Sequence, residues 1–163
     1  MTAVTDFSKL LRDLADFDES LTGWDMSGVT SMRAMLSGTR KFNQRLDFDT
    51  SSVTDMGSMF YDADSFNQPL LSFDLGSVLD IRFMFAACQL FDQPLSWDVS
   101  SVTDASTVFK WSGFNSPLAW DTRSVVTMEG IFDEARSFDQ PLGVQLGRRL
   151  AGDRRSTRRN SSH

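Results

Sequence analysis

The chain repeats one pattern of hydrophobic and polar positions five times. Each copy opens on an aromatic residue, and successive openings are 24, 25, 24 and 23 residues apart. The opening residues are Trp24, Phe48, Phe73, Trp97 and Trp120. Self-similarity at this period indicates a solenoid, in which each unit buries its apolar face against its neighbours. The 163-residue chain therefore has room for about five stacked units in one domain.

Part of each copy has helical spacing. The residues 8, 11, 12 and 15 positions after the opening aromatic are apolar or small, which is the i, i+3, i+4, i+7 pattern of one helical face. Seven positions after the aromatic, every copy has a residue that can cap a helix N-terminus. These residues are Ser31, Asp55, Asp80, Asp104 and Thr127. Each unit is thus predicted to contain a helix of about two turns.

The rest of each copy alternates with period two. In the fourth copy, Leu95, Trp97 and Val99 are separated by polar residues, as in a short half-buried strand. Pro94 stands just before this strand, where its missing N–H group is tolerated. We therefore predict an α/β fold: a right-handed strand–helix solenoid that is leucine-rich-repeat-like. It would have about five units of 23–25 residues, with short strands stacked in parallel.

A resemblance to a known family follows from the same residues. The segment Trp-Asp-Val-Ser-Ser-Val-Thr-Asp at 97–104, followed by Phe-x-x-x-x-Phe-Asn and Pro-Leu, resembles the repeat of BspA-like surface proteins. Mycoplasma lipoprotein-associated and listerial surface proteins have similar repeats of this length. The resemblance covers residues 21–146 and implies a leucine-rich-repeat-like scaffold, a location at the cell surface or outside the cell, and adhesive or protein-binding roles.

The two ends of the chain differ from the middle. Residues 1–20 have apolar positions at helical spacing, which predicts an N-terminal capping helix; a helix lying on a membrane surface is the alternative. Residues 21–146 form the predicted solenoid of five units and a partial sixth strand. Residues 147–163 contain six Arg and no periodicity, so they are predicted to be a disordered tail.

Charge and composition limit the possible partners. The chain carries 16 Lys and Arg against 22 Asp and Glu, a net charge of −6. Because the tail carries +5, residues 1–146 carry −11, and we do not expect a nucleic-acid partner despite the arginines of the tail. No segment is apolar for long enough to predict a membrane span. The first residues also lack the basic start and apolar run of an export signal.

Aspartates form the most suggestive row of polar positions. One follows each opening aromatic and is expected on the outward side of the predicted strands, where stacked carboxylates would repel one another. They are Asp25, Asp49, Asp74, Asp98 and Asp121. Three interpretations remain open: a ligand-binding face, a calcium-loaded ladder, or Asx turns in which each Asp accepts hydrogen bonds from the residues after it.

A second polar row lies in the loops that precede the strands. The residues are Asn43, Asn67, Asp92, Asn115 and Asp139, and we expect their side chains to satisfy loop backbone groups. Trp24, Trp97 and Trp120 are predicted to point inward, whereas Trp111 breaks the pattern and is a candidate surface contact.

Catalytic chemistry has little support in the sequence. The single histidine is His163, the single cysteine is Cys88 at a position of small core residues, and no glycine-rich phosphate loop is present. We therefore predict that the protein is not an enzyme and has no cofactor or metal site. The preferred function is an interaction module that binds a protein or glycan through the aspartate face. The alternative is a structural spacer, or a fragment of a longer repeat protein, without its own ligand. The sequence indicates neither the ligand nor an oligomeric state.

Overall fold

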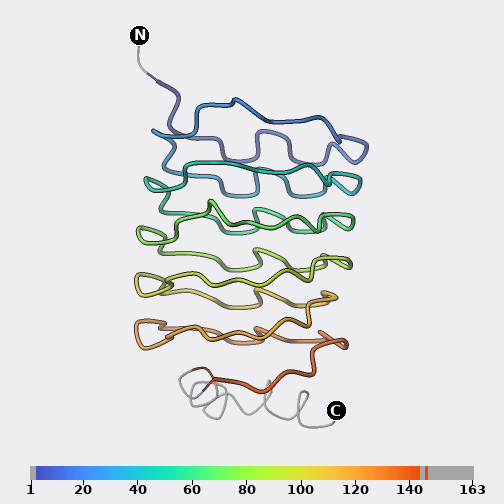
Figure 1. Cartoon of the computed structure of the whole chain (residues 1–163), viewed down its shortest axis with the longest axis vertical. Helices are drawn as coiled ribbons and strands as arrows, with labels where there is room; N and C mark the ends of the chain where they lie inside the picture. Colours follow the sequence, from blue (N-terminus) through green and yellow to red (C-terminus); the bar gives the residue numbers. More distant parts are fainter. Residues whose placement is uncertain (1–2, 144–145, 147–163) are drawn as a thin grey trace.

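The protein is a stack of coils, one for each copy of the repeat (Figure 1). The computed structural model describes residues 3–143 and residue 146. Coils 1 to 5 begin at the five opening aromatics, and they follow one another in chain order along the long axis of the molecule (Figure 1). The period of the sequence is therefore the period of the structure.

The predicted secondary structure is wrong. Residues 3–143 contain no helix and no strand longer than a single bridge residue. Their β pairing consists of five isolated parallel bridges: Asp6–Ser31, Ser31–Asp55, Asp55–Asp80, Asp80–Asp104 and Asp104–Thr127. The described residues thus form no sheet. Neither the α/β class nor the leucine-rich-repeat-like strand–helix solenoid with parallel stacked strands describes this protein.

The part of each coil predicted to be helical consists of tight turns. We call it the turn side; it spans the residues 8–15 positions after the opening aromatic, which are 32–39 in coil 1. Alternate residues from Met32 to Gly38 donate their backbone N–H groups to carbonyls of coil 2, at 2.7–2.9 Å. Of the residues between them, Met35 and Ser37 donate to carbonyls three residues back, at 3.1 and 3.3 Å, and Arg33 donates to the Ser31 hydroxyl oxygen at 3.3 Å. The same pattern recurs in coils 2 to 4.

Two residues on each turn side have a left-handed backbone, which excludes a helix. In coil 3 they are Phe83 and Ala87, with φ of 57° and 59°, whereas an α-helix needs φ near about −63°. Each is the third residue of a turn closed by an i to i+3 hydrogen bond, where a type II turn places its left-handed residue. The corresponding residues of the other coils also have positive φ.

The helical pattern nevertheless identified the buried side chains correctly. In coil 4, Ala105, Val108 and Phe109 are at most 1% exposed. A series of turns presents the same residues to the core that a helix would. A helix of two turns is marginal because its nucleation is costly, whereas a neighbouring coil offers a carbonyl to every second N–H group of the turn side. Hydrogen bonds between coils therefore replace the helical ones.

The opposite part of each coil is extended but unpaired. We call it the extended side; it runs from the residue three before the opening aromatic to the valine five after it, which gives 94–102 around Trp97 where coil 4 begins. The predicted alternation of buried and exposed side chains is confirmed there, since Leu95 and Val99 are buried and Asp98 is exposed. The run ends in a turn, in which the Val102 N–H group donates to the carbonyl of Val99 at 3.0 Å. Only the inside–outside pattern of a strand is present.

Aromatic ladders fill the core along the stack. Neighbouring loop phenylalanines stack with ring centroids 5.8–6.2 Å apart. This ladder contains Phe17, Phe42, Phe66, Phe91, Phe114 and Phe138. A parallel ladder on the turn side contains Phe60, Phe85, Phe109 and Phe132. The two ladders touch inside each of coils 2 to 5, at 3.9–4.4 Å between centroids.

The N-terminal segment covers coil 1 without forming the predicted capping helix. Lys9 and Asp13 have φ of 62° and 65°, so this segment adopts the backbone of a turn side. The N–H groups of Phe7, Lys9, Leu11 and Asp13 donate to carbonyls of coil 1 at 2.8–3.0 Å. The predicted disordered tail, residues 147–163, lies outside the described residues, and the division of the chain into three regions stays a prediction.

Candidate functional site

The aspartates of the extended side are all exposed, and each accepts a hydrogen bond from its own turn. The acceptor is Oδ1, and the donor is the backbone N–H group two residues later, at 2.8–3.2 Å. The five residues are Asp25, Asp49, Asp74, Asp98 and Asp121. The Asx-turn interpretation is therefore confirmed. Because Oδ1 is used in the turn, any outward role falls mainly to Oδ2.

Hydrogen bonding keeps several of these carboxylates ionised. The Ser27, Ser51 and Ser100 hydroxyls, followed by the backbone N–H groups of the same residues, lower the pKa of Asp25, Asp49 and Asp98 respectively. The Arg123 side chain does the same for the pKa of Asp121. Repulsion between neighbouring carboxylates acts in the opposite direction at Asp49 and Asp98, but it is the weakest of the effects there. The face thus carries a row of carboxylates, of which Asp121 is paired with Arg123.

The calcium interpretation finds no coordination site in the part of the chain that the structure describes. Within it, no three His, Cys, Asp or Glu residues are grouped so that they could hold a metal ion. Ca²⁺ takes six to eight oxygen ligands, several of them carboxylates, and a row of single aspartates one coil apart does not supply such a set. The calcium-loaded ladder stays a prediction.

A hollow lies between coils 3 and 4 on the extended side. It has a volume of about 380 Å³, and Asp74 and Asp98 both line it. Its apolar wall includes Leu71, which is 89% exposed, and the half-buried ring of Trp97. Of the five predicted site residues, the structure brings these two aspartates together beside an apolar surface.

An extra residue in coil 2 explains the exposure of Leu71. The interval from Phe48 to Phe73 is 25 residues, and Leu70-Leu71 stands where the next copy has only Leu95. Leu70 occupies the buried position, at 2% exposure, and a turn closed by the Phe73 N–H group and the Leu70 carbonyl turns Leu71 outward. The doubled leucine was visible in the sequence. The pattern of opening aromatics alone does not single it out.

The row of loop Asn and Asp residues holds consecutive coils together. The side-chain oxygen of each accepts the backbone N–H group of the corresponding residue in the next coil, at 2.7–3.0 Å. The row begins at Asp18 and continues through Asn43, Asn67, Asp92 and Asn115, with Asp139 as the last donor. The structural role predicted for these residues is confirmed, so they are not candidate ligand contacts.

Only one of the three tryptophans predicted to point inward is fully buried. Trp120 is buried, but Trp97 is only partly buried and Trp24 is 40% exposed. Trp111 is 43% exposed, as expected for a surface contact, and the Lys110 Nζ lies 4.3 Å from the centre of its ring. Trp24 packs edge to face against Phe7, and Trp97 stacks on Trp120, each with ring centroids 6.3 Å apart.

Neither of the residues best suited to nucleophilic or acid–base chemistry is part of a described site. Cys88 is fully buried, its thiol donates to the carbonyl of Phe60 at 2.8 Å, and burial raises the pKa of that thiol. His163 lies outside the described residues. Among the described residues no helix is long and apolar enough to cross a membrane. The prediction that the protein is not an enzyme stays a prediction.

Stacked coils, aromatic ladders and a side-chain ladder with the same period define a tandem-repeat protein. The chain belongs to the family described as "Mycoplasma protein of unknown function, DUF285", whose model matches residues 5–119 and 95–145. No curated protein and no solved structure matches the chain.

Proposed function

We propose that this protein is a non-catalytic interaction module that binds a partner protein through the extended side. The observation that carries the proposal is the hollow at Leu71 and Trp97, with Asp74 and Asp98 on neighbouring coils. A partner segment suited to it has an apolar side chain for the hollow and basic side chains for the aspartates. The resemblance of the repeats to BspA-like surface proteins supports binding at a cell surface.

The charge of the face supports a basic partner. Asp25 and Asp49 continue the negative row beyond the hollow, and the pKa of each is lowered, whereas the charge of Asp121 is balanced by its ion pair with Arg123. Complementary charge accelerates association and selects among partners more than it adds affinity. The apolar wall supplies the remaining energy, because an exposed Leu and a half-buried Trp gain from being covered.

Neutral substitutions that keep the turns test the proposal. Asn can accept the same backbone hydrogen bond as Asp, so Asp74→Asn with Asp98→Asn removes two charges from the hollow and preserves the Asx turns. The matched control is Asp92→Asn with Asp139→Asn, which removes two charges from the loop row. Asn already occupies that position in the three other coils, so the control fold is preserved.

The probe is a synthetic decapeptide of alternating Lys and Leu, with a Glu–Leu decapeptide for comparison. We expect the Lys–Leu peptide alone to bind, and Asp74→Asn with Asp98→Asn to weaken it about ten-fold, while the control pair changes it little. Leu71→Ser should weaken it too, without a change of charge. Equal losses in both Asn pairs would show attraction to the acidic body as a whole and would contradict a site at the hollow.

The alternative function is a spacer without its own ligand. The spacer is favoured if neither the Lys–Leu peptide nor any member of a panel of extracellular proteins and glycans binds. It is also favoured if binding occurs but survives Asp49→Lys, Asp74→Lys and Asp98→Lys combined in one variant. The regular structural use of every Oδ1 on this face is the observation that keeps the spacer in consideration.

A further inference from the structure

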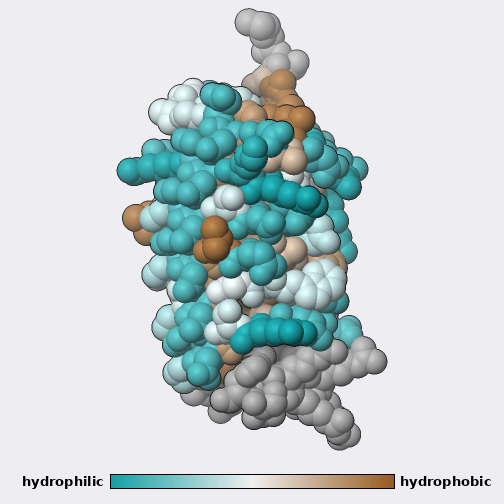
Figure 2. Space-filling model, turned by 90° about the vertical axis from the view of Figure 1, so that its right-hand side faces the viewer, coloured by the Kyte–Doolittle hydropathy of each residue, from teal (hydrophilic) through white to brown (hydrophobic). Residues whose placement is uncertain are grey.

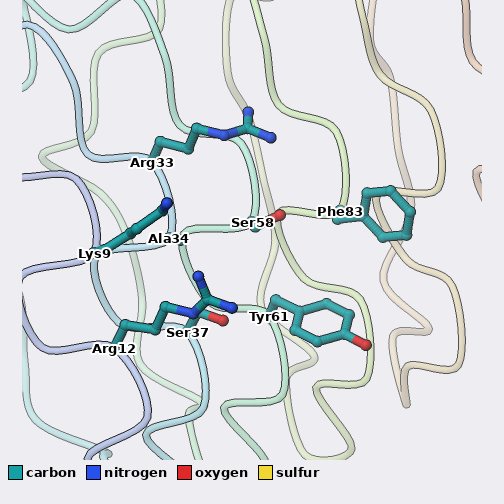
Figure 3. Close-up of a pocket in the computed structure, with 8 residues that line it drawn as sticks. All are labelled: Lys9, Arg12, Arg33, Ala34, Ser37, Ser58, Tyr61 and Phe83. Atoms are coloured by element: carbon teal, nitrogen blue, oxygen red, sulfur yellow. The ribbon is translucent and has the colours of Figure 1, made fainter.

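A second hollow lies on the turn side, and its charged lining residues are all basic. Its volume is about 460 Å³, and it extends from the N-terminal segment across coils 1 to 3. The lining residues are Lys9, Arg12, Arg33, Ala34, Ser37, Ser58, Tyr61 and Phe83 (Figure 3). The positive lining contrasts with the charge of −11 on residues 1–146. Figure 2 shows a largely hydrophilic face on which apolar groups are scattered.

The hollow exists because small residues meet at one point of the turn side. Ala34, Ser37 and Ser58 have short side chains, so they leave a depression between coils 1 and 2. Longer side chains surround it: Lys9 and Arg12 extend over it from the N-terminal segment, and Tyr61 and Phe83 stand on the far side (Figure 3). In coil 3, Phe83 occupies the position that Ser58 has in coil 2, and both have φ of 57°. A side chain of that size at position 58 would fill the depression.

The three basic groups differ in how far their charge is balanced. Arg33 lies 3.6 Å from Asp55 and 3.8 Å from Asp80, and its buried Nη1 has no hydrogen-bond partner. Arg12 lies 3.4 Å from Asp13, both side chains being largely exposed. Lys9 makes no ion pair with any residue that the structure describes. Lys9 and Arg12 are therefore the groups most available to an anion.

Hydroxyl groups and an aromatic wall complete the hollow. Within the described chain, the hydroxyls of Ser37, Ser58 and Tyr61 donate no hydrogen bond to another protein group. Tyr61 and Phe83 meet edge to face, with ring centroids 6.2 Å apart at 80°. Cations, unused hydroxyls and a ring surface are the groups that recognise a sugar carrying an acidic substituent, because they match its charge, its hydroxyls and its apolar ring face.

We propose that this hollow binds an acidic sugar residue. Lys9 and Arg12 hold its carboxylate or sulfate group, Ser58 and Tyr61 bond its hydroxyls, and the Tyr61–Phe83 pair contacts its ring. The volume lies within the range of about 300–1,000 Å³ usual for small-ligand sites. An acidic peptide would match the cations but would leave the hydroxyls and the ring surface without counterparts. This site is separate from the extended side and does not depend on the function proposed there.

The experiment titrates the full chain with glucuronic acid, glucose 6-sulfate, glucose and a tetraglutamate peptide, by calorimetry or NMR. We expect the two acidic sugars to bind, glucose to bind at least ten-fold more weakly, and the peptide not to bind. Binding should weaken as salt is added, because the anion contacts are exposed. Binding of either acidic sugar supports the proposal. The comparison of glucuronic acid with glucose 6-sulfate shows whether the site prefers a carboxylate or a sulfate group.

Two variants locate the site. Lys9→Gln with Arg12→Gln should weaken the acidic sugars about ten-fold, whereas Lys41→Gln with Arg45→Gln, exposed basic residues outside the hollow, removes the same charge without effect. Ser58→Phe should abolish binding with no change of charge, and unchanged thermal unfolding would show that the coil tolerates it as coil 3 does.

Several outcomes overturn the proposal. They are equal binding of glucose and glucuronic acid, equal loss in the two Gln pairs, or normal binding by Ser58→Phe. Binding of the peptide in preference to both sugars overturns it as well. None of these results bears on the Lys–Leu peptide experiment, so the two proposals fail separately.

Discussion

Asn67 shows how one side-chain oxygen holds two coils together. Its Oδ1 accepts the backbone N–H group of Asp92 at 3.0 Å and the side-chain amide of Gln93, also at 3.0 Å. Its own N–H group donates to Asn43 in the previous coil at 2.9 Å. One residue type at one position therefore satisfies backbone donors that the unpaired loops would otherwise leave to solvent.

We predict that Asn67→Ala destabilises the protein by about 1–2 kcal/mol, because the N–H group of Asp92 loses its acceptor and the amide of Gln93 keeps only the carbonyl of residue 67. Asn67→Asp should cost far less, since Asp92 performs the same role in the next coil. Urea unfolding of the two variants measures the difference. Equal destabilisation by both would show that the acceptor is not what matters.

The lowered pKa of Asp49 predicts a dependence of stability on pH. Its folded pKa lies below that of the unfolded chain, so its contribution is present above about pH 4 and is lost as the pH falls through the folded value. Asp49→Asn keeps the turn but cannot titrate. The melting temperature of the variant should therefore fall less steeply than that of the wild type between about pH 5 and pH 2. Parallel curves would contradict the assignment.

How much of the structure could be predicted differs between kinds of residue. Alternation at Leu95 and Val99 and the spacing of Val108 and Phe109 correctly identified the core, because burial follows from apolar periodicity alone. Periodicity did not reveal whether the backbone N–H groups donate hydrogen bonds within one coil or to the next coil. That choice depends on contacts 24 residues away, which local patterns do not contain.

The two candidate sites could also be predicted only in part. The aspartate row and its Asx turns could be predicted, since an Asp two residues before a Ser or Gly carries its own local mechanism. The hollow at Leu71 depends on one inserted residue. The basic hollow is lined by Lys9, Ala34 and Ser58, which occupy equivalent positions in successive segments at the repeat spacing of 25 and 24 residues. It was missed because residues 1–20 were predicted to be a helix and not a segment with the backbone of a turn side.

At the scale of the structural element, the turn side combines a left-handed residue with hydrogen bonds to the next coil. Left-handed backbone costs a residue with a Cβ atom roughly 1–2 kcal/mol, yet eight of the ten such positions in coils 1 to 5 are occupied by residues other than Gly. Side-chain packing and the hydrogen bonds between coils must offset that cost. These positions are therefore sensitive reporters of the backbone conformation.

We predict that Ala87→Gly leaves stability unchanged or raises it, because φ of 59° suits Gly better than Ala. The control is Ala86→Gly, which lies next to it without positive φ, is fully buried and should lose about 1 kcal/mol. Chemical denaturation measures both. If residues 81–88 were helical, both changes would cost about 1 kcal/mol.

At the scale of the whole molecule, each coil contacts only its neighbours, so stability should be nearly additive along the stack. The ladders of Phe and Asn continue without interruption from coil to coil. Removing one complete coil should therefore bring equivalent surfaces together. Removing half a coil would place a turn side against an extended side.

We predict that deletion of residues 97–119 gives a shorter folded protein, since Trp120 then follows Ser96 in place of Trp97. Its urea m-value should fall by roughly a sixth, in proportion to the surface buried. Deletion of residues 97–108 should abolish cooperative unfolding. Circular dichroism and denaturation of both deletions provide the measurement. Cooperative folding of the half-coil deletion would contradict the stacking of complete coils.

The doubled leucine at 70–71 has a consequence for how such a protein can change. One residue was accommodated as an outward turn, while Leu70 and Phe73 kept their places in the core. Insertions at this point of a coil thus alter what the surface offers to a partner and leave the stack intact. A lineage with this architecture can acquire new binding specificity one coil and one residue at a time, without passing through an unstable intermediate.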